Sequence, residues 1–340
     1  MKQTAVVIAP GRGTYNKTEL GYLARHHPNA PNLGQFDAFR IKLGQKTVSE
    51  LDTAARFSGP THTRGDNASA LIYACAHADF GAIDRDRFDI IGVTGNSMGW
   101  YIALACAGAL DPMGGMQVVN TMGTLMQEQM IGGQLIYPFV DADWKEIPNQ
   151  RENLMREVFA INARPDHVLG LSIDLGGMLV LAGNEAGLVA FENSAPVLQE
   201  RYPMRLPNHA GFHTHLQKPV SELGFSALPE HLFDQPSIPL VDGRGAIWQP
   251  KSTDTNALYT YTLGHQVYEL FDFTAAIRTA ARELMPDVFI ILGPGTTLIG
   301  ATAQALIRSK WRGWNSKLDV QKKNQGQPRL LSMAAMHTSV

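Results

Sequence analysis

The fold of this 340-residue chain is decided by residues 88–104, which read FDIIGVTGNSMGWYIAL. Residues 88–93 are mostly apolar, as in a buried strand, and residues 101–107 are small and apolar, as in a buried helix. Between them, glycines stand two residues before and two residues after Ser97, so the backbone can turn sharply there. The stretch predicts strand, turn and helix, with the Ser97 hydroxyl projecting from the end of the sheet as a nucleophile. The alternative is an ordinary strand-to-helix turn.

Apolar runs and capping signals on both sides of this motif predict an α/β protein. A buried strand at residues 5–9 leads into the glycine-rich turn Pro10-Gly11-Arg12-Gly13. Residues 131–207 read strand, helix, strand, strand, helix, which is typical of a small α/β unit inserted into a larger fold. The larger fold resumes after this unit. Its other predicted elements are helices at 66–80, 117–130 and 297–307 and a strand at 288–292.

Composition narrows the class of protein. With 44% hydrophobic and 18% charged residues the chain resembles an ordinary soluble enzyme, and a net charge of −2 gives no reason to expect nucleic acid. The two cysteines, Cys75 and Cys106, lie in Ala-rich runs and are interpreted as buried side chains. No window approaches the ~20 apolar residues of a membrane span, and the short apolar N-terminus is more typical of a first strand than of a signal peptide. We therefore expect a cytoplasmic protein without a membrane partner.

A serine nucleophile needs a base, and histidine has a suitable pKa. Among 11 histidines the best candidate is His213, in a loop-like stretch that reads HAGFHTH from residue 209. On the residues alone His215 is nearly as good a candidate. The spacing of His209, His213 and His215 also admits a metal cluster, but no acidic or cysteine partner stands at a supporting spacing. We expect no metal.

Four motifs occur in an order that resembles one enzyme family. They are Pro10-Gly11-Arg12-Gly13, Gly95-Asn96-Ser97-Met98-Gly99, Gly211-Phe212-His213-Thr214 and Leu292-Gly293-Pro294-Gly295. Over most of its length the chain resembles malonyl-CoA:acyl-carrier-protein transacylases, a family that also supplies acyltransferase domains of polyketide synthases. The resemblance implies an α/β-hydrolase-like core with a parallel sheet and an inserted ferredoxin-like subdomain. The predicted boundaries are 1–130 and 208–318 for the core, 131–207 for the subdomain and 319–340 for a basic tail.

The resemblance also implies site residues. Ser97 would attack an acyl-CoA thioester with His213 as general base, in a dyad that lacks a triad carboxylate. The backbone N–H groups of Arg12 and Met98 would form the oxyanion hole. Gln266 falls where the family has a glutamine near the site. The predicted substrate-binding set consists of Gln266 together with Gly11, Asn96 and Met122.

Three motifs depart from the family pattern. Arg12 replaces the usual glutamine, and the nucleophile turn reads GNSMGW where the family usually has GHSxGE. Most important, Met122 stands where an arginine normally pairs with the free carboxylate of malonyl groups. A carboxylate buried unpaired against a thioether would be costly, so the residues favour an acyl group without a terminal carboxylate. The competing interpretation is that Arg12 supplies the missing cation from the opposite wall.

The sequence thus predicts an acyltransferase of fatty acid or polyketide synthesis that moves an acyl group from CoA to an acyl carrier protein. Acyl-CoA is a substrate here, and no bound cofactor is expected. Two alternatives stay open: a thioesterase in which water resolves the acyl-Ser97, and a non-catalytic homologue that binds carrier protein. The C-terminal segment either steers an anionic partner or is a solvated basic tail. Against one acid, Asp319, it carries Arg308, Lys310, Arg312, Lys317, Lys322, Lys323 and Arg329.

Overall fold

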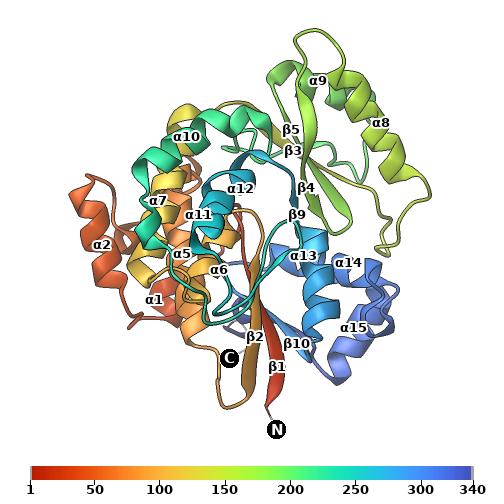
Figure 1. The fold of residues 1–340 in the computed structure, drawn as a ribbon. Coiled ribbons are helices and arrows are strands. Elements are labelled where there is room, and N and C mark those ends of the chain that lie inside the picture. The colour runs from red at the N-terminus through yellow and green to blue at the C-terminus, as the bar shows by residue number, and fades with distance from the viewer. Residues whose placement is uncertain (1, 338–340) are drawn as a thin grey trace.

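A six-stranded sheet forms the centre of the molecule in the computed structural model, which describes residues 2–337 (Figure 1). Its strand order is β11-β10-β1-β2-β7-β8, and all neighbours pair in parallel except β7 and β8. The central strands are buried on both faces, which explains their nearly continuous apolar sequences. The bounds are β1 (Gln3–Ala9), β2 (Phe88–Gly95), β7 (Leu240–Val241), β8 (Ile247–Trp248), β10 (Val288–Ile291) and β11 (Leu330–Ser332).

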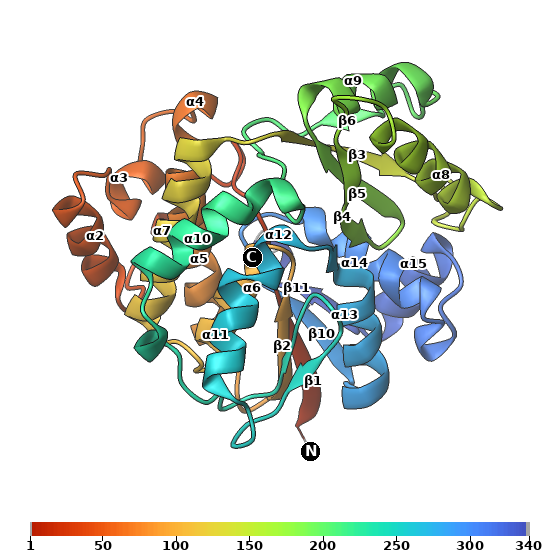
Figure 2. The same ribbon diagram turned by 45° about the horizontal axis from the view of Figure 1, so that its top comes forward.

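Helices cover both faces of this sheet, as an α/β fold requires to bury its two apolar faces (Figures 1 and 2). One group contains α5 (Gly65–Gly81), α6 (Gly99–Cys106) and α7 (Pro112–Gln129), and the other contains α13 (Phe273–Thr279) and α14 (Thr297–Arg308). The other helices outside the second sheet are α1 (Tyr22–His26), α2 (Leu33–Lys42), α3 (Val48–Asp52), α4 (Gly59–His62), α10 (Lys218–Ala227), α11 (Thr255–Leu263), α12 (His265–Tyr268), α15 (Lys317–Gly326) and α16 (Met333–His337). The predicted α/β class with a parallel sheet is confirmed.

A second sheet stands at one end of the molecule with its own apolar core (Figure 2). Its order is β6-β3-β5-β4-β9, and the first four strands pair antiparallel with α8 and α9 as connections. This is the order of a ferredoxin-like βαββαβ unit. The strand β9, which lies outside residues 131–207, extends the sheet by pairing in parallel with β4. The bounds are β3 (Gly133–Pro138), α8 (Gln150–Asn162), β4 (Leu169–Leu175), β5 (Met178–Gly183), α9 (Glu185–Ser194), β6 (Met204–Arg205) and β9 (Phe271–Asp272).

The local sequence signals locate most elements to within two residues. The predicted strand 5–9 and helices 66–80 and 297–307 correspond to β1, α5 and α14. The helix predicted from residue 117 begins five residues earlier, at Pro112. Asp111 caps it there, because its carboxylate accepts a hydrogen bond from the Gly114 N–H at 2.6 Å, and proline suits the first helical position.

The C-terminal segment is not the separate tail predicted for residues 319–340. The apolar pair Leu330 and Leu331 forms strand β11, which pairs with β10 at the edge of the main sheet. Two of the basic side chains also have local partners: Lys323 donates to the Gly313 carbonyl at 2.9 Å, and Arg329 donates to the Asp287 carbonyl at 3.2 Å. Residues 338–340 of that prediction lie outside the described residues. The strand was not predicted because basic residues dominate the composition of this segment.

The described helices include no candidate for a membrane span. Among residues 2–337, none of the helices combines the length and the apolar character needed to cross a bilayer.

Candidate active site

The turn between β2 and α6 holds Ser97 in a backbone conformation that residues other than glycine rarely adopt. Its φ is +56°, in the left-handed region, and such strain commonly marks functional positions. The flanking residues must be glycines because other backbone atoms lie too close to leave room for a Cβ. A Cβ on Gly95 would lie 2.1 Å from the Gly99 carbonyl oxygen, and a Cβ on Gly99 would lie 2.4 Å from the carbonyl oxygen of Ala9. The G-x-S-x-G pattern is therefore a steric requirement of this turn.

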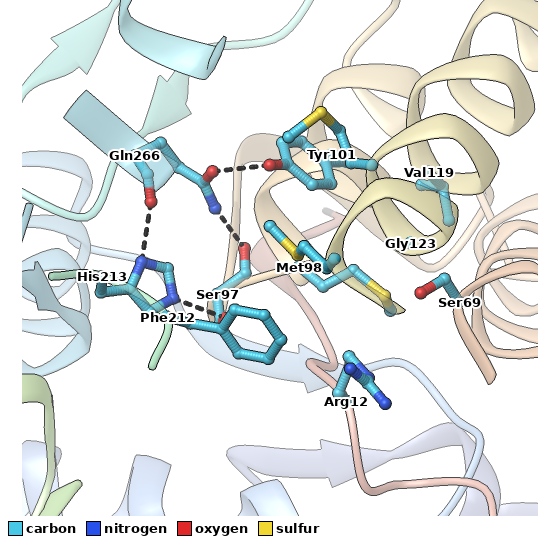
Figure 3. Close-up of a pocket in the computed structure, with 12 residues that line it drawn as sticks. Arg12, Ser69, Ser97, Met98, Tyr101, Val119, Gly123, Phe212, His213 and Gln266 are labelled. Atoms are coloured by element: carbon cyan, nitrogen blue, oxygen red, sulfur yellow. Dashed lines mark hydrogen bonds between the residues drawn. The ribbon is translucent and has the colours of Figure 1, made fainter. Parts of the chain in front are cut away.

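The structure brings His213 to the serine from a loop 116 residues away in sequence. The His213 Nε2 lies 2.7 Å from the Ser97 Oγ, and its Nδ1 lies 2.7 Å from the backbone carbonyl oxygen of Gln266 (Figure 3). A carbonyl oxygen can only accept, so Nδ1 carries the proton and Nε2 is left to accept from the serine hydroxyl. This is the tautomer that a general base needs. His215, the nearly equal candidate, lies exposed one turn further on.

Burial sets the protonation state of His213. Its side chain is buried, and desolvation lowers the pKa of His213 to about 4, against a smaller opposing effect of the hydrogen bond to Gln266. The imidazole is therefore neutral at pH 7 and able to take a proton from Ser97. Both ring nitrogens are already engaged, which removes His213 from the metal cluster considered for the HAGFHTH stretch.

Gln266 connects the serine, the histidine and a tyrosine. Its side-chain Nε2 donates to the Ser97 carbonyl at 3.1 Å, and its Oε1 accepts from the Tyr101 hydroxyl at 2.8 Å (Figure 3). The same residue orients His213 through its backbone carbonyl. A single buried residue at the start of α12 thus fixes the positions of the nucleophile and the base relative to each other.

The two backbone N–H groups that were predicted to form the oxyanion hole have no acceptor among residues 2–337. They belong to Met98, the N-cap of α6, and to Arg12, in the turn after β1. Both residues line the cavity together with Ser97, and the oxyanion hole stays a prediction.

A narrow, mostly apolar cavity of about 20 Å³ opens next to Ser97. Helix α7 contributes Val119, Met122, Gly123 and Met126 to its wall, and the Met122 side chain is only 1% exposed. The cavity has room for only about one water-sized group beside the side chains as they stand. Its lining consists of Arg12, Ser69, Ser97, Met98, Tyr101, Val119, Met122, Gly123, Met126, Phe212, His213 and Gln266 (Figure 3).

Arg12 is the one cationic side chain among these lining residues. Its Nη2 donates to the Thr63 carbonyl at 2.9 Å, and its guanidinium lies 5.7 Å from the centre of the Phe212 ring. Desolvation lowers the pKa of Arg12 to about 10, partly offset by the charge of Asp66, so the group stays cationic at neutral pH. Its buried Nε has no hydrogen-bond partner among the described residues.

The remaining predicted residues take different places. Gly11 and Asn96 do not line the cavity; a Cβ on Gly11 would lie 2.6 Å from the Asn96 carbonyl oxygen, so the two residues pack the turns together behind the serine. Tyr101 and Ser69 do line it and were missed, because a tyrosine or serine inside an apolar helix carries no local signal. Met122 and Gln266 are both at the cavity wall.

Comparison with known proteins gives a consistent result, although no family model matches the chain. The malonyl CoA-acyl carrier protein transacylase of Haemophilus influenzae is 26% identical over 315 residues, which cover 89% of this chain and 92% of that protein. The protein of the same name from Escherichia coli is 23% identical over 211 residues, and the match spans only 64% of its length.

Solved structures share the fold at low sequence identity. An acyl carrier protein S-malonyltransferase from Vibrio cholerae has a TM-score of 0.70 at 20% identity, with 90% of this chain and 94% of that chain covered. A malonyl-CoA:ACP transacylase from Synechocystis has a TM-score of 0.74 at 16% identity, with both chains covered in full.

Proposed function

We propose that this chain, which is similar in sequence and fold to malonyl CoA-acyl carrier protein transacylases, is an acyltransferase that acts through an acyl-Ser97 intermediate. The acyl donor is an acyl-CoA thioester and the acceptor is the pantetheine thiol of an acyl carrier protein. The observation that carries the proposal is the 2.7 Å contact between Ser97 Oγ and a neutral His213.

The proposed reaction has two similar halves. Ser97 Oγ attacks the thioester carbonyl while His213 Nε2 takes the hydroxyl proton, and the N–H groups of Arg12 and Met98 stabilise the oxyanion. Collapse of this intermediate expels the CoA sulfur, which takes the proton from His213. The carrier thiol then gives its proton to His213 and attacks the acyl-Ser97 ester. The Ser97 oxygen leaves and takes this proton back from His213, which restores the dyad. No net proton or electron is consumed.

The cavity supports an acyl group without a terminal carboxylate. Met122 and Met126 present thioethers where a carboxylate would need a cation, and the small cavity volume suits a short chain such as acetyl. An unpaired buried carboxylate costs at least ~3 kcal/mol, which corresponds to a preference of about 100-fold for acetyl-CoA over malonyl-CoA.

Arg12 supports a second candidate substrate class. A guanidinium that lines the cavity with an unpartnered Nε could receive the free carboxylate of a malonyl group in place of the missing arginine. The two candidates differ in one measurable respect, because only the second makes acylation depend on the Arg12 side chain.

Mass spectrometry of the intact protein after brief exposure to acetyl-CoA or malonyl-CoA tests both. We expect an acetyl adduct that is absent in Ser97→Ala, is retained in Arg12→Ala and transfers to a carrier thiol. Faster malonylation that disappears in Arg12→Ala would establish the second candidate instead. Release of free acid without any thiol acceptor would identify a thioesterase, and absence of every adduct would contradict an enzymatic function.

A further inference from the structure

A second group of histidines, remote in sequence from the Ser97 site, surrounds a buried carboxylate. Asp79, near the end of α5, is 0% exposed. The His27 Nε2 lies 2.6 Å and the His337 Nε2 lies 3.1 Å from its Oδ1. The three residues come from α5, from the C-terminal cap of α1 and from α16, and their ligand atoms all lie within 4.8 Å of one another.

The carboxylate is held so that this oxygen faces the histidines. Its other oxygen, Oδ2, accepts from the Tyr22 hydroxyl at 2.8 Å and from the Gly293 N–H at 2.6 Å. The buried carboxylate thus has four hydrogen-bond partners, of which His27 and His337 lie at Oδ1 and Tyr22 and Gly293 at Oδ2. The Asp79 Oδ2 is held by hydrogen bonds, and its Oδ1 faces two imidazoles. Three potential metal ligands are therefore already close together and oriented.

We propose that His27, Asp79 and His337 bind a divalent transition metal ion of the zinc type. Two imidazole nitrogens and one carboxylate oxygen form a ligand set that Zn²⁺ accepts, with water in the fourth position. Ligand atoms around a tetrahedral ion with bonds of ~2.0–2.1 Å are about 3.3 Å apart. The His337–Asp79 pair is already close to that spacing, and the His27–Asp79 pair must open by less than 1 Å.

The surroundings fit the proposal. The Tyr22 hydroxyl and the Gly293 N–H supply the outer hydrogen bonds that orient a ligating carboxylate. The His26 ring stacks on His337 at 4.4 Å between centroids and restricts its rotation. The His337 side chain is 21% exposed, which provides a path for the ion from solvent. Binding requires both Nε2 atoms to be unprotonated, so any proton they carry moves to Nδ1 or to solvent.

The consequence of binding is structural. The ion joins the last described helix, α16, to α1 and α5, and thereby fixes the C-terminal end of the chain against the helix layer. Because none of the three ligands lines the cavity beside Ser97, the proposal is independent of the proposed acyl transfer.

Titration of the full chain, first freed of metal with a chelator, tests the proposal. We expect one Zn²⁺ per chain by calorimetry, a higher unfolding temperature with Zn²⁺ than with Mg²⁺, and visible bands of low-symmetry Co²⁺ when Co²⁺ is used as the probe. His337→Gln and His27→Gln should each weaken Zn²⁺ binding at least tenfold. His231→Gln, which removes an exposed histidine elsewhere, should leave binding unchanged.

His337→Gln changes the last described helix only, so the sheets should fold in this variant and its binding defect can be interpreted. Absence of saturable binding, or equal binding by the wild type and both ligand variants, would overturn the proposal. A His231→Gln variant that loses the same binding would do so as well, because it would assign the ion to surface histidines.

Discussion

The Ser97 site and the Asp79 cluster both contain histidine, but they differ in the charge that the imidazoles face. His213 faces a serine hydroxyl and a backbone carbonyl, both neutral, and the pKa of His213 is lowered to about 4 by desolvation. His27 and His337 face the Asp79 carboxylate. A neutral setting keeps an imidazole unprotonated and makes it a base, whereas imidazoles around a carboxylate form the ligand set that we propose for a metal ion. Position inside the protein is thus not sufficient to assign a histidine its role.

The largest effect is expected from removing the anion of the second group. In Asp79→Asn the amide NH2 must face hydrogen-bond donors in place of an oxygen, so the free energy of unfolding should fall by about 3 kcal/mol. Urea denaturation followed by tryptophan fluorescence measures this change. Asp89→Asn, at an exposed position on β2, is the matched control and should change stability little. Equal effects of the two variants would show that the carboxylate in the histidine group has no special role.

A change of pH is expected to have an intermediate effect on the rate of Ser97 acylation, through protonation of His213. Because the pKa of His213 is lowered, its Nε2 is unprotonated from pH 8 down to about 5, and the rate of Ser97 acylation should be flat over that range. Below pH about 4 the rate should fall about tenfold per unit as the base becomes protonated.

The lowered pKa of His213 also makes the stability of the folded protein depend on pH. A histidine whose folded pKa lies below its unfolded value of ~6.5 takes up its proton more readily when unfolded, so stability declines as pH falls from 6.5 toward 4. Rapid-mixing acylation, with fluorescence to verify that the protein is folded, separates the two effects. An acid limb with its midpoint near 6.5 would contradict a desolvated base.

The smallest effect is expected from Gln266→Ala. The substitution keeps the backbone carbonyl that orients His213 but removes the side-chain bonds to the Ser97 carbonyl and to Tyr101. We expect acylation to slow about threefold to tenfold, while the acid limb of its pH profile stays in place. Tyr101→Phe removes one of these bonds and should have a smaller effect. A shifted acid limb in Gln266→Ala would mean that the side chain controls the base as well as the serine.

The difference between the two histidine groups also explains what the sequence could and could not predict. The Ser97 turn and the buried strands and helices follow from local patterns, because steric and apolar requirements concern a few consecutive residues. The parallel sheet and the role of His213 were predicted from the family resemblance. The carboxylate group joins positions 27, 79 and 337, and only tertiary packing brings them together. Asp79 ends an Ala-rich helix and reads as an ordinary solvent-facing residue until α1 and α16 cover it.

The choice between His213 and His215 likewise depended on tertiary structure. The two residues have the same local context, but only His213 has a carbonyl, from Gln266 53 residues away, to orient it. The C-terminal strand was missed for the opposite reason. Two leucines were outweighed by seven basic residues in the same segment, although an edge strand needs only a few paired residues.

The attachment of the second sheet to the His213 loop has a mechanical consequence. Ser172 on β4 donates to the Phe212 carbonyl at 2.8 Å, and Gln134 on β3 donates to the Ser172 hydroxyl at 2.7 Å. Strand β9, which follows Gln266 closely in the chain, is a member of the same sheet. A hinge motion between the two bodies would therefore pull the imidazole off the nucleophile. The second sheet is therefore a support for the loop that holds the His213 Nε2 2.7 Å from the Ser97 Oγ.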